Sequence, residues 1–159
     1  MDDRRRARDV LDAQEGTGTV PILERDEALA VLRAAHRIAI VGASPDAERP
    51  SHDVMRYLRD HGYDCVPVNP NAQEVLGERC YPSLAEAAAA VGPIDIVDVF
   101  RRSAYTPEIA RSAVAIGATC LWLQLGVVNW EAARIAHEAG LAVVMDRCTA
   151  MDHRLIRDA

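Results

Sequence analysis

The sequence predicts an α/β fold, a Rossmann-like doubly wound parallel sheet of five strands in a single domain. Three observations support this fold class. The chain has 159 residues, the usual length of one domain, and half of them are apolar. Short apolar runs alternate with segments of helical spacing. The runs are apolar throughout, as expected for strands that are covered on both faces.

The expected elements follow a polar lead-in. Residues 1–20 run into the turn-forming GTGTVP at 16–21 and are expected to be mobile, which leaves 21–159 as the domain. A first helix is expected over 24–37, where Leu29, Leu32 and His36 fall near helical spacing. The expected strands are 38–41, 65–68, 94–100, 120–125 and 142–145.

A helix is expected in each gap between successive strands. Ser51, Ser83 and Thr106 are expected to cap three of these helices, and the fourth is expected over 129–139. Connections of this length imply parallel strands joined by right-handed crossovers, and the order 3-2-1-4-5 is expected for the sheet. In such sheets, ligands bind beyond the carboxyl ends of the strands, at the switch point beside the first strand.

Charge and composition narrow the classes of partner. The formal net charge is −6, so a nucleic-acid-binding surface is not expected. All 18 basic residues are arginines, and the sequence contains no lysine. Contacts to a phosphate must therefore come from arginine, histidine, hydroxyl or backbone N–H groups.

Cysteine usage and hydropathy indicate a cytoplasmic protein. The four cysteines form no C-x-x-C pair, which is typical of a reduced chain. No apolar stretch is long enough to cross a membrane, so no membrane partner is expected. The histidines and cysteines lack the spacing of a zinc site, so no metal is expected.

The loop after the first strand has the features of a diphosphate cradle. Gly42 allows a tight turn and a close backbone approach, and Ser44 adds a hydroxyl donor. Arg49 and Ser51 stand where the next helix begins, and free N–H groups at a helix start attract anions. The alternative is a plain strand-to-helix turn with a helix cap.

A nicotinamide dinucleotide fits this loop less well. The G-x-G-x-x-G fingerprint is incomplete, because Ser44 and Ala47 stand where glycines would be expected. The second strand ends in Val68-Asn69-Pro70, with no acid to bind ribose hydroxyls. An NAD(P)-binding oxidoreductase is therefore the second hypothesis, and Asn69 and Pro70 can border an adenine ring instead.

Several residues near other strand ends are open to two interpretations. Arg101 is expected to contact a ligand, whereas Arg102 is expected to face solvent or form a salt bridge. Asp98 lies inside an apolar strand and is expected to be paired structurally rather than catalytic. Asp146 and Arg147 are expected to pair with each other. Cys148 is expected to be an ordinary half-buried cysteine, with a redox thiol as the alternative.

Four ordered stretches resemble a known family: VGASPDAERPSHDVMRYLRDHGYDCVPVNP, DIVDVFRR, LWLQLGV and VVMDRC. They resemble the small stand-alone CoA-binding domain proteins, which are similar to the N-terminal domain of the succinyl-CoA synthetase alpha subunit. The resemblance implies coenzyme A as the cofactor, with these binding residues: Gly42, Ala43, Ser44, Arg49, Pro50 and Ser51 at the diphosphate; Val68, Asn69 and Pro70 at the adenosine; Phe100 and Arg101 beside the phosphate or pantetheine; Gln124, Leu125 and Gly126 along the arm.

The chain also departs from this family. The synthetase domain has a lysine soon after the proline of its second strand, where this chain has Asn71-Ala72-Gln73. Arg79 is a candidate to replace that lysine at the 3′-phosphate. The resemblance ends before the phosphohistidine domain, so ligase activity is not carried over.

The expected function is therefore a binding module for CoA or acyl-CoA without catalytic residues. A Rossmann shell that has lost its ligand and works through an unknown protein partner is a third hypothesis. The apolar stretch LWLQLGVVNW is a candidate homodimer surface.

Overall fold

The computed structural model describes residues 20–157, so the expected mobile lead-in lies, except for Val20, outside the described residues. Along the chain the elements are α2 (Arg25–Ala34), β1 (Arg37–Val41), α3 (Pro50–Asp60), β2 (Asp64–Val68), β3 (Glu74–Val75), β4 (Glu78–Arg79), α4 (Leu84–Val91), β5 (Ile96–Val99), the 3-10 turn η1 (Ser103–Tyr105), α5 (Thr106–Ala115), β6 (Cys120–Leu123), α6 (Trp130–Glu138), β7 (Ala142–Val144) and α7 (Thr149–Arg157).

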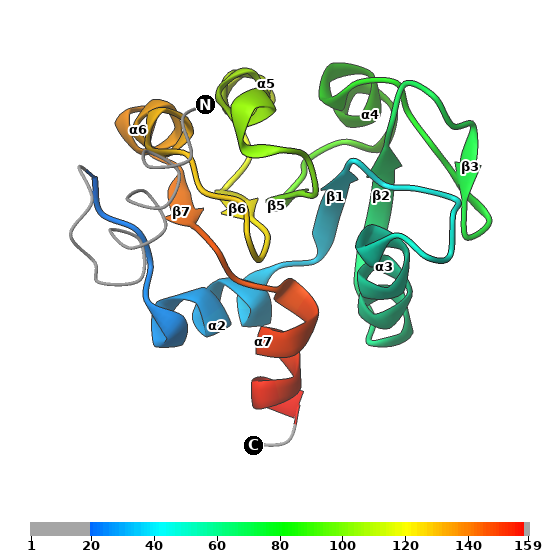
Figure 1. Cartoon of the computed structure of the whole chain (residues 1–159), viewed down its shortest axis with the longest axis horizontal. Helices are drawn as coiled ribbons and strands as arrows, with labels where there is room; N and C mark the ends of the chain where they lie inside the picture. The colour runs from blue at the N-terminus through cyan, green and yellow to red at the C-terminus, as the bar shows by residue number, and fades with distance from the viewer. Residues whose placement is uncertain (1–19, 158–159) are drawn as a thin grey trace.

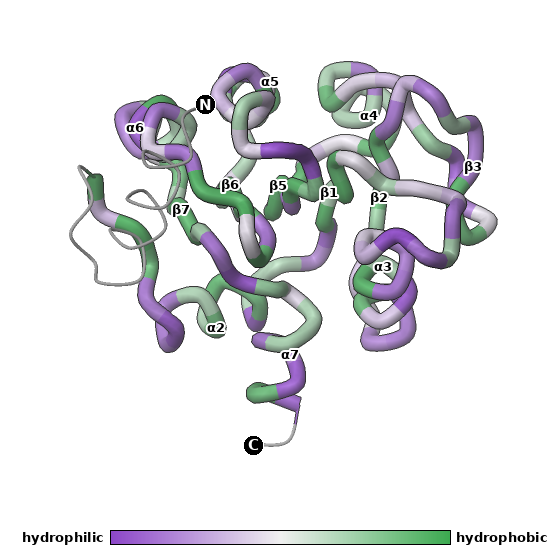
Figure 2. Tube along the Cα trace, in the orientation of Figure 1, coloured by the Kyte–Doolittle hydropathy of each residue, from purple (hydrophilic) through white to green (hydrophobic). Residues whose placement is uncertain are grey.

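Five parallel strands form the central sheet, as predicted. Helices α4, α5 and α6 cover one face, and α2, α3 and α7 cover the other (Figure 1). Side chains alternate between the two faces. Ile38 and Ile40 pack toward α2 and α3, whereas Ala39 and Val41 pack toward α4 and α5. Hydrophobic residues accordingly concentrate along the strands in Figure 2.

The strand order differs from the expected 3-2-1-4-5. The observed order is β2-β1-β5-β6-β7, so the third main strand pairs with the first and the second lies at the edge. Pro67 explains the edge position, because a proline has no N–H to give to a second neighbouring strand. Its carbonyl instead accepts a hydrogen bond from the backbone N–H of Tyr81 at 3.0 Å. The switch point therefore lies between β1 and β5.

Two predicted helix starts are shifted toward the N-terminus, by two residues in α3 and by one in α5. Helix α3 begins at Pro50, and Arg49 rather than Ser51 occupies the cap position. A proline suits the first helical position because the N–H that it lacks would have no partner there. Helix α5 includes Thr106, and Tyr105 precedes it. The cap at Ser83 is confirmed, since its hydroxyl accepts the N–H of Glu86 at 3.2 Å.

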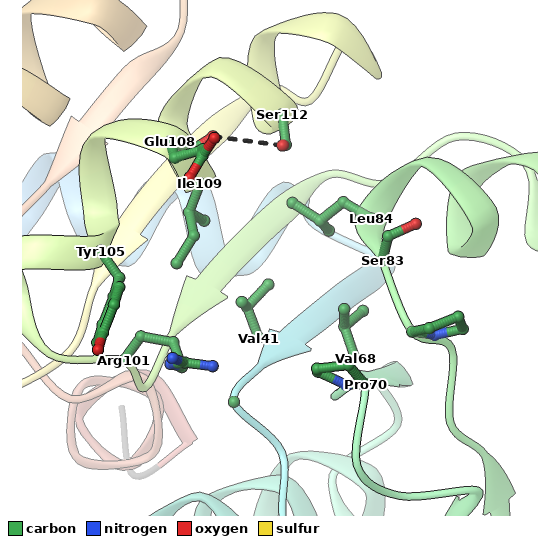
Figure 3. Close-up of a pocket in the computed structure, with 12 residues that line it drawn as sticks. Val41, Val68, Pro70, Ser83, Leu84, Arg101, Tyr105, Glu108, Ile109 and Ser112 are labelled. Carbon is green, nitrogen blue, oxygen red and sulfur yellow. Dashed lines mark hydrogen bonds between the residues drawn. The ribbon is translucent and has the colours of Figure 1, made fainter.

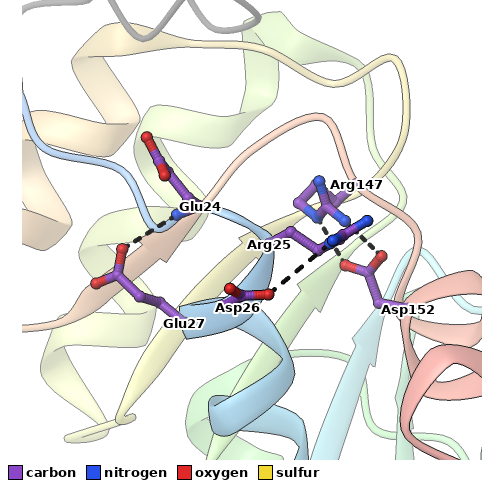
Figure 4. Close-up of polar contacts among 6 residues, drawn as sticks. All are labelled: Glu24, Arg25, Asp26, Glu27, Arg147 and Asp152. Atoms are coloured by element: carbon purple, nitrogen blue, oxygen red, sulfur yellow. Dashed lines mark hydrogen bonds and ion pairs between the residues drawn. The ribbon is translucent and has the colours of Figure 1, made fainter. Parts of the chain in front are cut away.

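The structure adds elements that were not predicted from the sequence, the hairpin β3–β4 and the helix α7. Helix α7 packs against α2 and α3. Arg147, just before α7, pairs with Asp152 through two contacts of 2.7 Å (Figure 4), so the expected pairing of Arg147 with Asp146 is wrong. Asp146 instead accepts the N–H of Gly126 at 2.7 Å, because β7 delivers it beside the end of β6. Among residues 20–157 no helix has the length and apolarity that a membrane span requires.

Candidate ligand-binding cleft

A polar chamber of about 560 Å³ opens at the carboxyl ends of the strands. Its volume falls within the roughly 300–1,000 Å³ of small-molecule sites. Residues from five separate segments meet there, and most of the predicted site residues are among them: Gly42, Ser44, Arg49, Pro50, Ser51, Asn69, Phe100, Arg101, Gln124, Leu125 and Gly126. Arg102 lines the same chamber, although the sequence favoured a role outside the site.

An apolar chamber of about 260 Å³ adjoins it on the side of α4 and α5 (Figure 3). The predicted residues Val68 and Pro70 line it, together with Val41, Leu84 and Ile109. Gly42 and Arg101 line both chambers and so mark their junction. Sequence reasoning missed the contribution of α4 and α5, because it considered only the loops that directly follow the strands.

Ala43 is the predicted site residue that lines neither chamber. Its side chain is fully buried in the core beneath the loop. Its carbonyl accepts a hydrogen bond from the Asn69 side chain at 2.7 Å. The Asn69 amide also accepts the N–H of Asn71 at 2.8 Å, so Asn69 links the loop after β1 to the loop after β2.

Gly42 adopts a conformation that favours glycine, with φ of +88°. A β-carbon at this position would lie 2.8 Å from the carbonyl oxygen of Phe100. The N–H of Gly42 donates to the carbonyl of Val68 at 3.0 Å. Glycine is therefore required at position 42 because the ends of β1, β2 and β5 approach closely there, whether or not a ligand binds.

The polar chamber carries positive charge. Arg49, Arg101 and Arg102 line it, and no aspartate or glutamate is among its lining residues. Arg101 lies over the Tyr105 ring, with the guanidinium carbon 4.7 Å from the ring centre. Arg49 has only a long, exposed contact of 4.0 Å with Asp46. Because guanidinium groups bind phosphate oxygens in pairs, the chamber suits a phosphorylated ligand.

A polar network lies beneath the floor of the cleft. Asp98 is fully buried, and its carboxyl accepts a hydrogen bond from Thr149 at 2.9 Å and one from Gln124 at 3.4 Å. Burial raises the pKa of the Asp98 carboxyl well above its usual range, and the hydrogen bond from Thr149 opposes that shift. The expected structural pairing of Asp98 is confirmed by these contacts.

None of the four cysteines forms a disulfide, and three of them are buried. Burial raises the pKa of Cys65 and of Cys120 to about 12, so these thiols stay protonated at neutral pH. Cys148 is half-buried, as expected. In the part of the chain that the structure describes, no cluster of three or more His, Cys, Asp or Glu side chains could hold a metal ion.

Comparison with known proteins identifies the family. Residues 36–154 match the CoA binding domain family. The uncharacterized protein YneT of Bacillus subtilis is 41% identical over 127 residues, which cover 80% of this chain and 92% of that protein. The ADP-forming acetate–CoA ligase II of Archaeoglobus fulgidus is 35% identical over 51 residues, which are 31% of this chain and 8% of the ligase.

Solved structures share the fold. A hypothetical protein from Pyrococcus horikoshii OT3 has a TM-score of 0.80 and 40% identity, and the match covers 87% of this chain and 97% of that one. A protein from Thermus thermophilus has a TM-score of 0.77 and 38% identity, with 84% and 99% covered. The chain therefore belongs to the CoA binding domain family.

Proposed function

We propose that the chain is a non-catalytic module that binds coenzyme A or an acyl-CoA, with the diphosphate held where β1 turns into α3. One observation carries the proposal: an arginine-lined chamber and an apolar chamber meet at Gly42 and Arg101. A nucleotide suits a polar chamber next to an apolar one, because its phosphates are anionic whereas its base is flat and largely apolar.

The two chambers suggest which part of the ligand lies where. The base enters the apolar chamber between α4 and α5, and the diphosphate lies at the junction, within reach of Arg101 and the Ser44 hydroxyl. The pantetheine arm then runs along Gln124, Leu125 and Gly126. This placement agrees with the roles that the family resemblance implies for these segments.

Arginines inside the cleft are better placed for the 3′-phosphate than Arg79. Arg79 lies over the Tyr81 ring at 5.1 Å and lines neither chamber. The chain has no lysine, so Arg49, Arg101 and Arg102 are the cations of the cleft that can meet the phosphates.

An NAD(P)-binding oxidoreductase is less well supported. The segment after β2 offers Asn69 where an acid would bind ribose hydroxyls, and the Asn69 amide is already engaged with Ala43 and Asn71. The buried, hydrogen-bonded Asp98 and the buried thiols favour a binding role over catalysis.

Calorimetric titration of ligand-free protein with CoA, and with NAD in parallel, tests the proposal. Saturable CoA binding near micromolar strength, about −8 kcal/mol, with no heat from NAD, is the expected result. Tighter binding of NAD would favour the oxidoreductase. If neither CoA nor NAD gives a heat of binding, the proposal is overturned and the ligand-free interaction subunit becomes the best hypothesis.

A further inference from the structure

The two chambers differ in the charged residues that line them. The polar chamber is lined by three arginines and no acid, whereas the apolar chamber is lined by Arg101 and by one acidic residue, Glu108. Glu108 lies in the first turn of α5. Figure 3 shows Ile109 between Glu108 and Arg101, so the two charged residues stand at different ends of the apolar wall.

Glu108 is exposed, and its carboxylate is open to solvent or to a ligand. The carboxylate makes no hydrogen bond or ion pair with any side chain or backbone group of residues 20–157. The contact from the Ser112 hydroxyl, at 3.3 Å, goes to the backbone carbonyl of Glu108 rather than to its carboxylate. A carboxylate accepts hydrogen bonds and cannot donate them, so a ligand group at this position must carry N–H or O–H.

The apolar walls restrict what kind of group arrives there. Val41, Val68 and Pro70 form the side of the chamber at the strand ends, and Leu84 and Ile109 form the side of the helices (Figure 3). Apolar surfaces of this kind pack against the faces of a flat heteroaromatic ring and leave only its edge to polar groups. A base linked to phosphates at the Gly42 junction can turn its far edge toward α5, where Glu108 and Ser112 are the polar residues of the lining.

We propose that Glu108 selects the base of the bound nucleotide by accepting a hydrogen bond from an exocyclic amino group, as adenine offers at its 6-position. A purine with oxygen at that position presents an acceptor there and carries its donor on the neighbouring ring nitrogen N1, so it cannot make the same contact with the carboxylate without shifting in the chamber. The inference rests on the proposed function, and it adds a specificity-determining residue to that site.

The test compares CoA with its 6-oxo analogue, in which hypoxanthine replaces adenine. Wild-type protein is expected to bind CoA about tenfold more tightly, as for one hydrogen bond to a charged group. Glu108→Gln keeps the size of the side chain but offers both an acceptor and a donor, so the preference should fall to within about twofold. Calorimetry measures both affinities for each protein.

Glu86→Gln is the matched control. Glu86 occupies the first turn of the neighbouring helix α4, and it lines neither chamber. Both substitutions remove an acid from a helix start, so they share any effect on helix stability. The control should keep the tenfold preference for CoA.

The outcomes separate this inference from the function on which it rests. Equal binding of the two compounds by the wild type, or an unchanged tenfold preference in Glu108→Gln, overturns the role of Glu108 and leaves CoA binding intact. Failure of the wild type to bind either compound overturns the proposed function and this inference together.

Discussion

At the scale of single residues, Gly42 has a structural role that the sequence did not reveal. From the sequence alone, this glycine is assigned to a tight turn and to the backbone approach of a phosphate. In the folded chain, a β-carbon on this residue would meet the Phe100 carbonyl, and the backbone has a φ of +88°. A larger residue at this position therefore strains the junction of β1 and β5 before any ligand is involved.

Gly42→Ala is expected to lower the free energy of unfolding by about 1–3 kcal/mol, because alanine is strained at positive φ and its β-carbon meets a backbone oxygen. Urea denaturation measures the change. Gly62→Ala is the control, since Gly62 also has a positive φ, +95°, but an added β-carbon there has no atom within 4 Å. Equal losses in the two variants would show that the contact with Phe100 contributes nothing.

Asp98 should make stability depend on pH. A carboxyl whose pKa is higher in the folded protein holds its proton more tightly there than in the unfolded chain. Its contribution to stability is therefore complete below the unfolded pKa of about 4, and it is lost as the pH rises toward the folded pKa. Asp98→Asn does not titrate and lacks this loss.

The stability of the wild type relative to Asp98→Asn should thus decline above about pH 4, by at most about 1.4 kcal/mol per pH unit. Urea denaturation at several pH values from about 4.5 to about 7.5 checks this trend. Thr149→Val, which removes the hydroxyl donor and keeps the carboxyl, should retain the decline. A constant difference between the wild type and Asp98→Asn across this range would contradict the raised pKa of Asp98.

At the scale of elements, the strands of the central sheet were predicted correctly and their order was not. Apolar runs identify buried strands, but they do not say which strand pairs with which. Pro67 was the available signal, because a proline inside an apolar run indicates an edge strand. Most of the predicted site residues still line one chamber, since loops after parallel strands meet at one edge of the sheet in either arrangement.

Helix α7 was not predicted, for a different reason. Its exposed residues include Met151 and Leu155, so its apolar pattern does not mark the buried side. Its start is fixed instead by partners distant in sequence: Thr149 donates to Asp98 on β5, and the Trp122 indole donates to the carbonyl of Arg147 at 2.8 Å. Contacts between residues that lie 25 or more positions apart leave no recognisable pattern in the local sequence.

The Arg147–Asp152 pair should stabilise the start of α7 (Figure 4). The Asp152 side chain is 6% exposed and the Arg147 side chain 29%, so Asp152→Asn leaves a partly buried guanidinium with a weaker partner. We expect a loss of about 1–3 kcal/mol, measured by thermal unfolding. Asp53→Asn breaks an equally short pair whose side chains are more than half exposed, and it should cost less than about 1 kcal/mol. Similar losses in both would rule out burial as the source of the stabilisation.

At the scale of the whole molecule, the described surface offers little support for the predicted homodimer face. Trp122 is fully buried and Trp130 is half-buried, so Leu125, 62% exposed, is the large apolar residue of the LWLQLGVVNW stretch that faces solvent. Leu125 also lines the polar chamber. Its exposure is therefore explained as well by a ligand as by a second copy of the chain, and the homodimer stays a prediction.

The two-chamber cleft makes ligand binding a property of the whole fold, because its walls come from strand ends, α3, α4 and α5. Ligand that binds only the folded state, at about 100 times its dissociation constant, adds about 2.7 kcal/mol of stability. In a chain of this size CoA should then raise the Tm by roughly 5–10 °C.

Arg101→Met should remove most of this rise in Tm, because Arg101 lines both chambers. Arg111→Met is the control: Arg111 pairs with Glu131 at 3.6 Å outside the cleft. A full rise in Arg101→Met would show that the phosphates lie elsewhere.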